Sequence, residues 1–418
     1  MFLIEIQGLF NRFDYKFELK EEGITILTGP NGFGKSTILK CIDELSREFE
    51  GLYYLATSIE FKKIIFQIDG DRYRFEKSNN HLIINDNSIS LIPFKKLNIS
   101  LNSRNTISKR YKEANHMIVD TYGRKEYQKK DYILEYIEEY IIRNEEEMDI
   151  KKIEVILNKL ALQLKQVYFV SEQRILKAHV GNRNDLDVID TIKYLPNELK
   201  NIITNYQTKY SKIATELDST YPKRLFITNE EMNETQFSTK MDELINKYEI
   251  LNKYKLVTTT VITNVEFKSE FSKALKIYFD DFEKKYKEYE SLIDELNLFT
   301  DIINDKLLFK KLVISPEYGF ILIEEDTGNE IDLETLSSGE KQLIILFYNL
   351  IFNAESDCYL LIDEPEISLH IIWQKKFMDD LIKVRNYKKY NVIIATHSPQ
   401  IISHYWNLQV DLGELYGK

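Results

Sequence analysis

The sequence predicts an α/β fold in which one sheet-containing lobe, formed from both ends of the chain, is split by a helical, coiled-coil-like insertion. Three observations lead to this class. Segments with the alternation and the apolar runs of β-strands fill about the first hundred residues and return after residue 307. Charged segments with helical periodicity dominate the sequence between them. Near the end of this central part, apolar residues recur every seven positions.

The composition fits a globular protein of two or three domains, with 418 residues, 43% of them apolar and 29% charged. The two cysteines, Cys41 and Cys358, form no CxxC pair, which argues against a zinc site or a disulfide framework and favours a reducing cytoplasm. We expect no signal peptide and no membrane span, because the N-terminus lacks a basic region and no long apolar run occurs. The net charge of −11 argues against general coating of nucleic acid but leaves a local basic groove open.

These patterns divide the chain into five segments. A hairpin is expected in "KIIFQIDGDRYRF", where Asp69 and Gly70 make the turn. The segments are an N-terminal lobe (1–97), a helical, basic-rich insertion (98–164), a strand region (165–182), a helical coiled-coil-like insertion (183–306) and a C-terminal lobe (307–418). The basic cluster of the first insertion comprises Arg104, Lys109, Arg110, Lys112, Arg124, Lys125, Lys129 and Lys130.

The second insertion carries a heptad pattern. It predicts a seam of about four heptads on a helix over about 265–306, on the order of 60 Å long. A long helix that packs against its own neighbours explains the same pattern, and both interpretations stay open. The seam residues are Leu275, Phe282, Tyr289, Leu296 and Ile303, interleaved by Phe279, Tyr286 and Ile293.

A phosphate-binding loop, "GPNGFGKST", lies between the apolar strand "ITILT" and the helix "TILKCIDEL". Its glycines allow a backbone that points N–H groups at an anion, and the helix start adds its positive dipole end. We expect Lys35 to neutralise the β- and γ-phosphates of ATP, Ser36 to ligate Mg²⁺ and Thr37 to add a phosphate contact. The candidate nucleotide-binding residues of this loop are Gly29, Asn31, Gly32, Gly34, Lys35, Ser36 and Thr37.

Polar groups follow three further apolar strands. "CYLLIDEPE" ends in Asp363 and Glu364, and "VIIATHSPQ" places His397 at the end of the next strand. Asp363 fits the acid that holds the Mg²⁺ shell in P-loop NTPases. Because neighbouring strand residues alternate in direction, Glu364 points elsewhere and is expected to polarise the attacking water. His397 would sense the γ-phosphate, and Gln173 in "VYFVSEQR" would complete the Mg²⁺ shell.

A second glycine-marked helix start, "LETLSSGEKQ", lies about three hundred residues after the first. Ser337 and Glu340 have the spacing of a capping box before the apolar run "KQLIILFYNLIF". Serine hydroxyls and a glycine N–H at a helix start also form an anion site. Ser337, Ser338, Gly339 and Glu340 are therefore candidate nucleotide-binding residues as well.

Taken in order, "GPNGFGKST", "SEQR", "LSSGEKQ", "LLIDEPEISLH" and "ATHSPQ" resemble the Walker A, Q-loop, signature, Walker B with D-loop, and switch-histidine motifs of the ABC-type ATPase superfamily. The resemblance covers about half of the chain. The long segment between Gln173 and the signature, and the "DEPE" and "THSPQ" variants, are similar to the AAA-21, OLD, RecF and SMC-like branch rather than to transporters. The resemblance implies an ABC-type P-loop ATPase head that uses ATP and Mg²⁺ in a head-to-tail homodimer or a higher homo-oligomer.

Within this branch the chain resembles the stand-alone ATPases of the PARIS and Septu anti-phage systems. That resemblance implies a nucleotide-driven switch acting on a separate effector, such as a Toprim or HNH nuclease, with nucleic acid or a phage protein as a trigger. No Toprim domain is expected after His397, because few residues follow it. Two alternatives stay open: a RecF/SMC-like DNA-repair ATPase that grips DNA with the basic cluster, and an ATP-binding assembly scaffold with little turnover.

Overall fold

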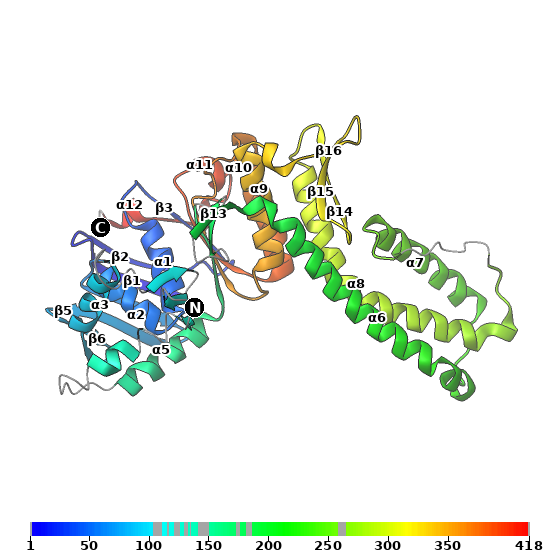
Figure 1. The fold of residues 1–418 in the computed structure, drawn as a ribbon, viewed down its shortest axis with the longest axis horizontal. Coiled ribbons are helices and arrows are strands. Elements are labelled where there is room, and N and C mark those ends of the chain that lie inside the picture. Colours follow the sequence, from blue (N-terminus) through cyan, green and yellow to red (C-terminus); the bar gives the residue numbers. More distant parts are fainter. Residues whose placement is uncertain are drawn as a thin grey trace. The chain divides into compact units, whose positions relative to one another are not determined.

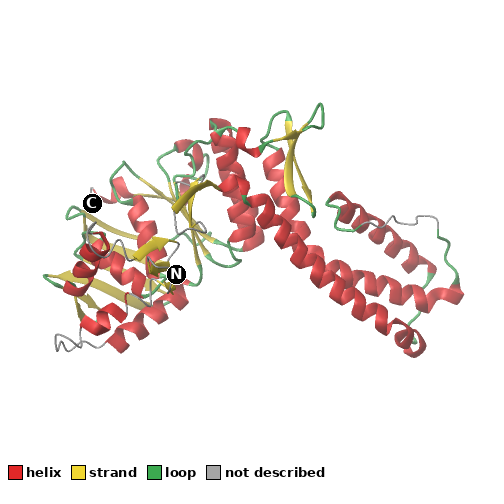
Figure 2. Ribbon diagram, in the orientation of Figure 1, coloured by secondary structure: helices red, strands yellow, loops and turns green. Residues whose placement is uncertain are grey.

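The computed structural model has two compact units, drawn as ribbons in Figures 1 and 2, and the predicted α/β class is confirmed. The first unit joins both ends of the chain, Met1–Ile189 and Asn353–Lys418, and the second is Asp190–Phe352. The structure describes residues 2–102, 111–114, 117–120, 126–128, 133, 135–140, 150–172, 176–180, 186–257 and 265–416.

An antiparallel sheet forms one part of the first unit. Its strands alternate buried and exposed side chains, as in β2, because one face packs on the core. The predicted Asp-Gly hairpin joins β4 and β5, and Asp69 and Gly70 both have positive φ, 48° and 94°. The sheet order is β2-β1-β4-β5-β6-β7, from β1 (Phe2–Leu9), β2 (Phe13–Glu18), β4 (Lys63–Ile68), β5 (Asp71–Ser78), β6 (His81–Ile84) and β7 (Asn87–Ser90).

A parallel sheet forms the other part and brings the polar strand ends together. The strand β3 is buried along its whole length, as its apolar sequence predicts. Asp363 pairs with Ala395, and Ala395 pairs with Leu27, so the segments that follow β17, β18 and β3 leave the sheet at the same edge. The sheet order is β11-β17-β18-β3-β19, from β3 (Ile24–Thr28), β11 (Val167–Val170), β17 (Tyr359–Asp363), β18 (Asn391–Ala395) and β19 (Gln409–Asp411).

The helix α1 (Lys35–Leu45) packs on the parallel sheet, and its buried Ile38 and Ile42 belong to a core shared with the antiparallel sheet. This core fixes the position of the α1 start, where the phosphate loop ends. Other helices of the unit, among the described residues, include α2 (Phe49–Thr57), α3 (Ile92–Asn102), α5 (Ile150–Leu164), α10 (Ile371–Lys388), α11 (Pro399–Ile402), η5 (Trp406–Leu408) and α12 (Leu412–Tyr416).

Short strands replace part of the helical insertion expected from residue 98 to residue 164, so that expectation is wrong there. Strands of three or four residues are too short to show a period of two, and the high charge of this region favoured a helical interpretation. Of the basic cluster, only Lys112 lies within the described residues, and its side chain is not described. The strands within this range are β8 (Tyr111–Ala114), β9 (Met117–Asp120) and β10 (Glu126–Gln128), which form one sheet. After this range, β12 (Leu176–Val180) pairs with β13 (Leu186–Asp190).

Three long helices dominate the second unit: α6 (Leu195–Ile227), α7 (Glu234–Lys253) and α8 (Ser272–Asn304). Contacts of Arg224 with Asp281 and of Tyr210 with Tyr289 show that α6 and α8 run antiparallel. All predicted seam residues except the half-buried Leu275 are buried. They pack between helices of the same chain, which accounts for the heptad pattern without a second chain. No helix in the described part of the chain is long and apolar enough to span a membrane.

A small antiparallel sheet and the helix α9 (Ser338–Tyr348) complete the second unit. Gly319 approaches α6 so closely that a Cβ atom would lie 1.8 Å from the Pro196 carbonyl oxygen, and its φ of 73° also favours glycine. Residues 307–352 of the predicted C-terminal lobe therefore group with the long helices. The remaining elements are β14 (Lys310–Ser315), β15 (Gly319–Glu324), β16 (Glu330–Ile331), the 3-10 helices η1 (Thr191–Lys193), η2 (Ser269–Phe271) and η3 (Leu333–Thr335), and a π-helical turn, η4 (Asn349–Asn353).

Candidate functional site

The loop between β3 and α1 borders a pocket of about 390 Å³ in the first unit. Gly34 precedes α1 with a φ of 88°, and a Cβ atom there would lie 2.6 Å from the Leu9 side chain, so both the backbone conformation and the packing favour glycine. No side chain caps α1, which leaves its first N–H groups available to an anion. The pocket is lined by the predicted Asn31, Gly32, Gly34, Lys35, Ser36, Thr37, Glu364 and His397, and by Phe10, Glu172 and Ile367.

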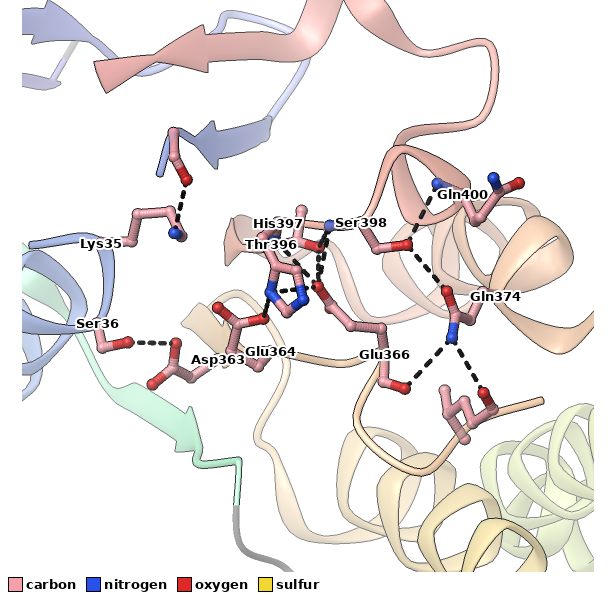
Figure 3. Close-up of polar contacts among 12 residues, drawn as sticks. Lys35, Ser36, Asp363, Glu364, Glu366, Gln374, Thr396, His397, Ser398 and Gln400 are labelled. Carbon is pink, nitrogen blue, oxygen red and sulfur yellow. Dashed lines mark hydrogen bonds and ion pairs between the residues drawn. The ribbon is translucent and has the colours of Figure 1, made fainter. Parts of the chain in front are cut away.

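Two side chains at the start of α1 connect the loop to its surroundings (Figure 3). The Lys35 ammonium donates hydrogen bonds to the carbonyl oxygens of Gly29, at 2.8 Å, and Pro30, at 3.4 Å. The Ser36 hydroxyl donates to Asp363 Oδ1 at 2.8 Å, across 327 positions of sequence. Asp363 is buried at the end of β17, with 4% of its surface exposed. The hydroxyl and carboxylate oxygens form a hard donor pair of the kind that Mg²⁺ prefers.

Glu364 and His397 face each other beside this pair. Glu364 has a φ of 44°, so its backbone leaves the strand conformation, and its N–H donates to the Ala395 carbonyl. The Glu364 carboxylate lies 2.5 Å from His397 Nδ1. Burial, together with a hydrogen bond to Glu366 and the charge of Glu366, raises the pKa of Glu364 to about 7, although His397 acts in the opposite direction. A carboxylate with such a pKa can exchange a proton with water near neutral pH.

Sequence reasoning missed several residues of this site. Glu366 is a third acid in "DEPE" and contacts His397, so an acid that directly follows Pro365 was the signal that could have found it. Glu172 lines the pocket, whereas the predicted Gln173 lies outside the described residues. Phe10 follows β1 and carries no motif. A larger hollow of about 790 Å³ elsewhere in this unit contains none of the predicted residues.

A family described as AAA ATPase domain matches residues 4–402, which is most of the chain. The chain belongs to this AAA ATPase domain family. The matched range includes the phosphate loop, the acids after β17 and His397. Membership implies that the protein binds ATP.

Solved structures resemble this AAA ATPase domain only remotely. They include the Smc head domain of Pyrococcus furiosus, with an extended coiled coil and bound to the C-terminal domain of ScpA (14% identity, 96% of this chain and 92% of that chain covered, TM-score 0.36). Another is the SMC head domain of Thermotoga maritima (12% identity, 96% and 90% covered, TM-score 0.32). These likenesses are too weak to transfer a residue role or a partner. No curated protein matches the chain.

The second glycine-marked helix start of this AAA ATPase domain, "LSSGEKQ" at the beginning of α9, lies in the second unit. Ser337 and Glu340 form the predicted capping box: the serine hydroxyl accepts from Glu340 N–H at 3.3 Å, and the glutamate accepts from Ser337 N–H at 3.0 Å. Lys310 donates to the same carboxylate at 2.8 Å. Although burial acts in the other direction, hydrogen bonds from Lys310 and Ser337 hold the pKa of Glu340 below its ordinary value. Ser337 and Ser338 are exposed, while the Glu340 side chain is engaged within its own unit.

Proposed function

We propose that the protein is an ABC-type ATPase that binds Mg²⁺-ATP at the phosphate loop and hydrolyses it. The observation that carries this proposal is the Ser36–Asp363 hydrogen bond of 2.8 Å, which joins the loop to the end of β17. Ser36 and Asp363 would hold Mg²⁺, whose charge would offset that of the phosphates. Lys35 would exchange its carbonyl partners for phosphate oxygens, and the glycine N–H groups would bind the remaining anionic oxygens.

Glu364 would act as the general base of this reaction. Its carboxylate lies in the same pocket as the phosphate loop, and it would take a proton from the attacking water. The imidazole of His397 would orient that carboxylate and report the presence of the terminal phosphate. The water oxygen would form a bond to the γ-phosphorus, and the bond from that phosphorus to the β,γ-bridging oxygen would break, leaving ADP and inorganic phosphate.

The exposed start of α9 supports a site that is shared between two copies of the chain. Ser337, Ser338 and Gly339 would meet the terminal phosphate held by the phosphate loop of the partner copy. The Glu340 carboxylate accepts hydrogen bonds from Lys310 and from the Ser337 N–H. It would therefore stabilise the helix start rather than contact phosphate. A head-to-tail homodimer, or a multiple of it, would then be the active species.

Two variants test this function. Lys35→Ala should lose ATP binding, because the positive charge beside the phosphates is removed. Glu364→Gln should keep ATP binding, stop phosphate release and trap a closed dimer. We would measure nucleotide affinity by calorimetry, phosphate release by a coupled assay and mass by light scattering. A Glu364→Gln protein that releases phosphate at the wild-type rate would refute the proposed base. ATP-dependent assembly with negligible release in the wild type would instead favour the scaffold function.

The same measurements test the shared site. Ser338→Arg should preserve ATP binding in the first unit while it blocks dimer closure and hydrolysis, because a bulky cation would occupy the phosphate position. Arg introduced at an exposed position of α10, as in Lys375→Arg, provides a control that changes neither property. Normal dimerisation and turnover of Ser338→Arg would rule out the shared arrangement.

For the biological role, we propose that ATP-dependent closure switches a separate effector, such as a nuclease, in anti-phage defence. This role rests on the resemblance of the motif set to stand-alone defence ATPases. A nuclease gene beside the gene of this protein, and phage protection that Glu364→Gln abolishes, would support it. The basic cluster favours a second candidate, a DNA-repair ATPase. Salt-sensitive DNA binding that is lost on replacing Lys129 and Lys130 would favour repair over defence.

A further inference from the structure

Glu366 is a buried acid that the proposed reaction does not use. It lies two residues after Glu364, on the far side of Pro365, and only 6% of its surface is exposed. One carboxylate oxygen, Oε2, is buried without a hydrogen-bond partner among the described residues. A buried carboxylate is costly unless strong hydrogen bonds offset its desolvation, so the contacts of the other oxygen decide what this side chain does.

The other oxygen, Glu366 Oε1, binds three consecutive residues that follow β18 (Figure 3). It accepts hydrogen bonds from the Thr396 hydroxyl at 2.6 Å, from His397 N–H at 3.0 Å and from Ser398 N–H at 3.1 Å. His397 Nδ1 lies 3.3 Å from the same oxygen. Hydrogen bonds to an ionised acceptor are about twice as strong as neutral ones. Glu366 therefore fixes the turn that carries the histidine.

The His397 imidazole itself lies largely open to solvent. The side chain of His397 is 52% exposed, so packing alone does not select its orientation. The contacts to its ring come from Glu364, 2.5 Å from Nδ1, and from Glu366, 3.3 Å from the same nitrogen, and Glu366 also holds the backbone of the turn. Gln374 extends this support: its Nε2 donates to the Leu369 carbonyl at 3.0 Å, and its Oε1 accepts from the Ser398 hydroxyl at 2.9 Å. The segment after β17 and the segment after β18 are thus tied together at Glu366.

We propose that Glu366 is a positioning residue for hydrolysis: its buried carboxylate holds the Thr396–Ser398 turn and contacts the His397 ring, and in this way it places the imidazole against Glu364. This inference rests on the proposed ATPase function. A misplacement of about 1 Å in such a group can lower a rate by about a hundredfold. Glu366 touches neither the phosphate loop nor the Ser36–Asp363 pair in any contact described, so ATP binding should not depend on it.

The test compares Glu366→Ala with Glu366→Gln in the full chain. Alanine removes the acceptor, whereas glutamine keeps an oxygen that the turn can bind. We expect Glu366→Ala to lower kcat by ten- to a hundredfold, with KM for ATP within about twofold of wild type. Glu366→Gln should recover most of the rate. Asp379→Asn, which neutralises an exposed acid on α10, is the matched control and should keep the wild-type kcat and KM.

A double-mutant cycle with His397→Ala shows whether Glu366 acts through the histidine. In the His397→Ala background, adding Glu366→Ala should change kcat less than about twofold. The proposal would be overturned if the two substitutions lowered kcat by factors that multiply in the double variant, or if Glu366→Ala kept the wild-type kcat.

If Glu366→Ala does not fold, Thr396→Val removes one donor to Glu366 and should lower kcat at unchanged KM. An unchanged kcat in Thr396→Val would equally overturn the proposal. If the wild-type protein releases no phosphate from ATP, the proposed function fails instead, which separates the two results.

Discussion

At the scale of single residues, the side chains proposed to bind phosphate and metal ion and to activate water already have partners within the protein. Lys35 is bonded to the loop carbonyls, Ser36 to Asp363, and Glu364 to His397. These pairs keep the side chains in place at the positions where phosphate, metal ion and water are proposed to bind. Binding would then exchange partners rather than order free side chains, which limits its cost in conformational entropy.

The Ser36 hydroxyl gives the first prediction. Ser36→Ala should weaken Mg²⁺-dependent ATP binding by about tenfold or more, because a hydrogen bond to a charged group is worth about 1.5–3 kcal/mol. ATP affinity measured with Mg²⁺ and with a chelator separates the metal-dependent part. Ser46→Ala, just after the far end of α1, removes a hydroxyl that donates to the Asp43 carbonyl, outside the phosphate loop, and should leave both affinities unchanged. An equal loss with and without Mg²⁺ would argue against a metal ligand at Ser36.

Sequence reasoning could identify those residues of the site that follow a recognisable strand or loop. Asp363 and His397 end apolar strands, and parallel strands place such ends at one edge. Glu366 was not predicted as a site residue, because its hydrogen-bonding partners lie thirty or more positions away in sequence and an acid in a loop is usually solvated. The positive φ of Glu364 could not be predicted from the sequence either, since surrounding contacts impose such a conformation on a non-glycine residue.

At the scale of elements, the α9 start combines a local and a proposed intermolecular task. Ser337 caps the helix, while Ser338 does not. Ser337→Ala should therefore destabilise the second unit by about 1 kcal/mol, and Ser338→Ala by less than about 0.5 kcal/mol. Urea unfolding followed by circular dichroism measures both. Equal destabilisation by the two variants would contradict the capping assignment.

The pairing of α6 with α8 gives the next prediction. Arg224 donates two hydrogen bonds of 2.6 Å to Asp281, whose side chain is 9% exposed. Arg224→Ala should cost about 2–3 kcal/mol of unfolding free energy, less than a fully buried pair because the guanidinium is partly exposed. Lys285→Ala removes the partner of the exposed Asp218 on the same pair of helices and should cost less than about 1 kcal/mol. Denaturant unfolding of both variants measures these free energies. Similar losses of unfolding free energy in the two variants would show that water replaces Arg224 at Asp281, and would contradict the prediction.

The elements that the sequence predicted well are those with a strong local signal. Asp69 and Gly70 predicted a hairpin because few other dipeptides fit two positive φ angles. The heptads predicted a long helix, but periodicity alone does not tell whether the facing residues belong to the same chain. The strands β8, β9 and β10 could not be predicted from their sequences. They are too short for the alternation of apolar and polar residues to repeat often enough to be detected.

At the scale of the whole molecule, the two units have separate cores, and only one contains the phosphate loop. ATP should therefore stabilise the first unit against unfolding by about 2.7 kcal/mol at a hundredfold excess over Kd, and raise the melting temperature of the transition that reports this unit. Scanning calorimetry with and without Mg²⁺-ATP measures this. Lys35→Ala should abolish the shift, and a shift that survives in that variant would place ATP elsewhere.

The strand order of the parallel sheet also affects how the chain is made. The strand β3 lies between β18 and β19, which the ribosome adds more than 360 residues later. At about 5–20 residues per second, this delay is roughly 20–80 s. The second unit is continuous in sequence and is complete once Phe352 is added, before β17, β18 and β19 are made. Its helices can therefore fold while the phosphate loop still lacks the neighbours of its own strand. A nascent chain would therefore carry the helices of the second unit before it could bind its first nucleotide.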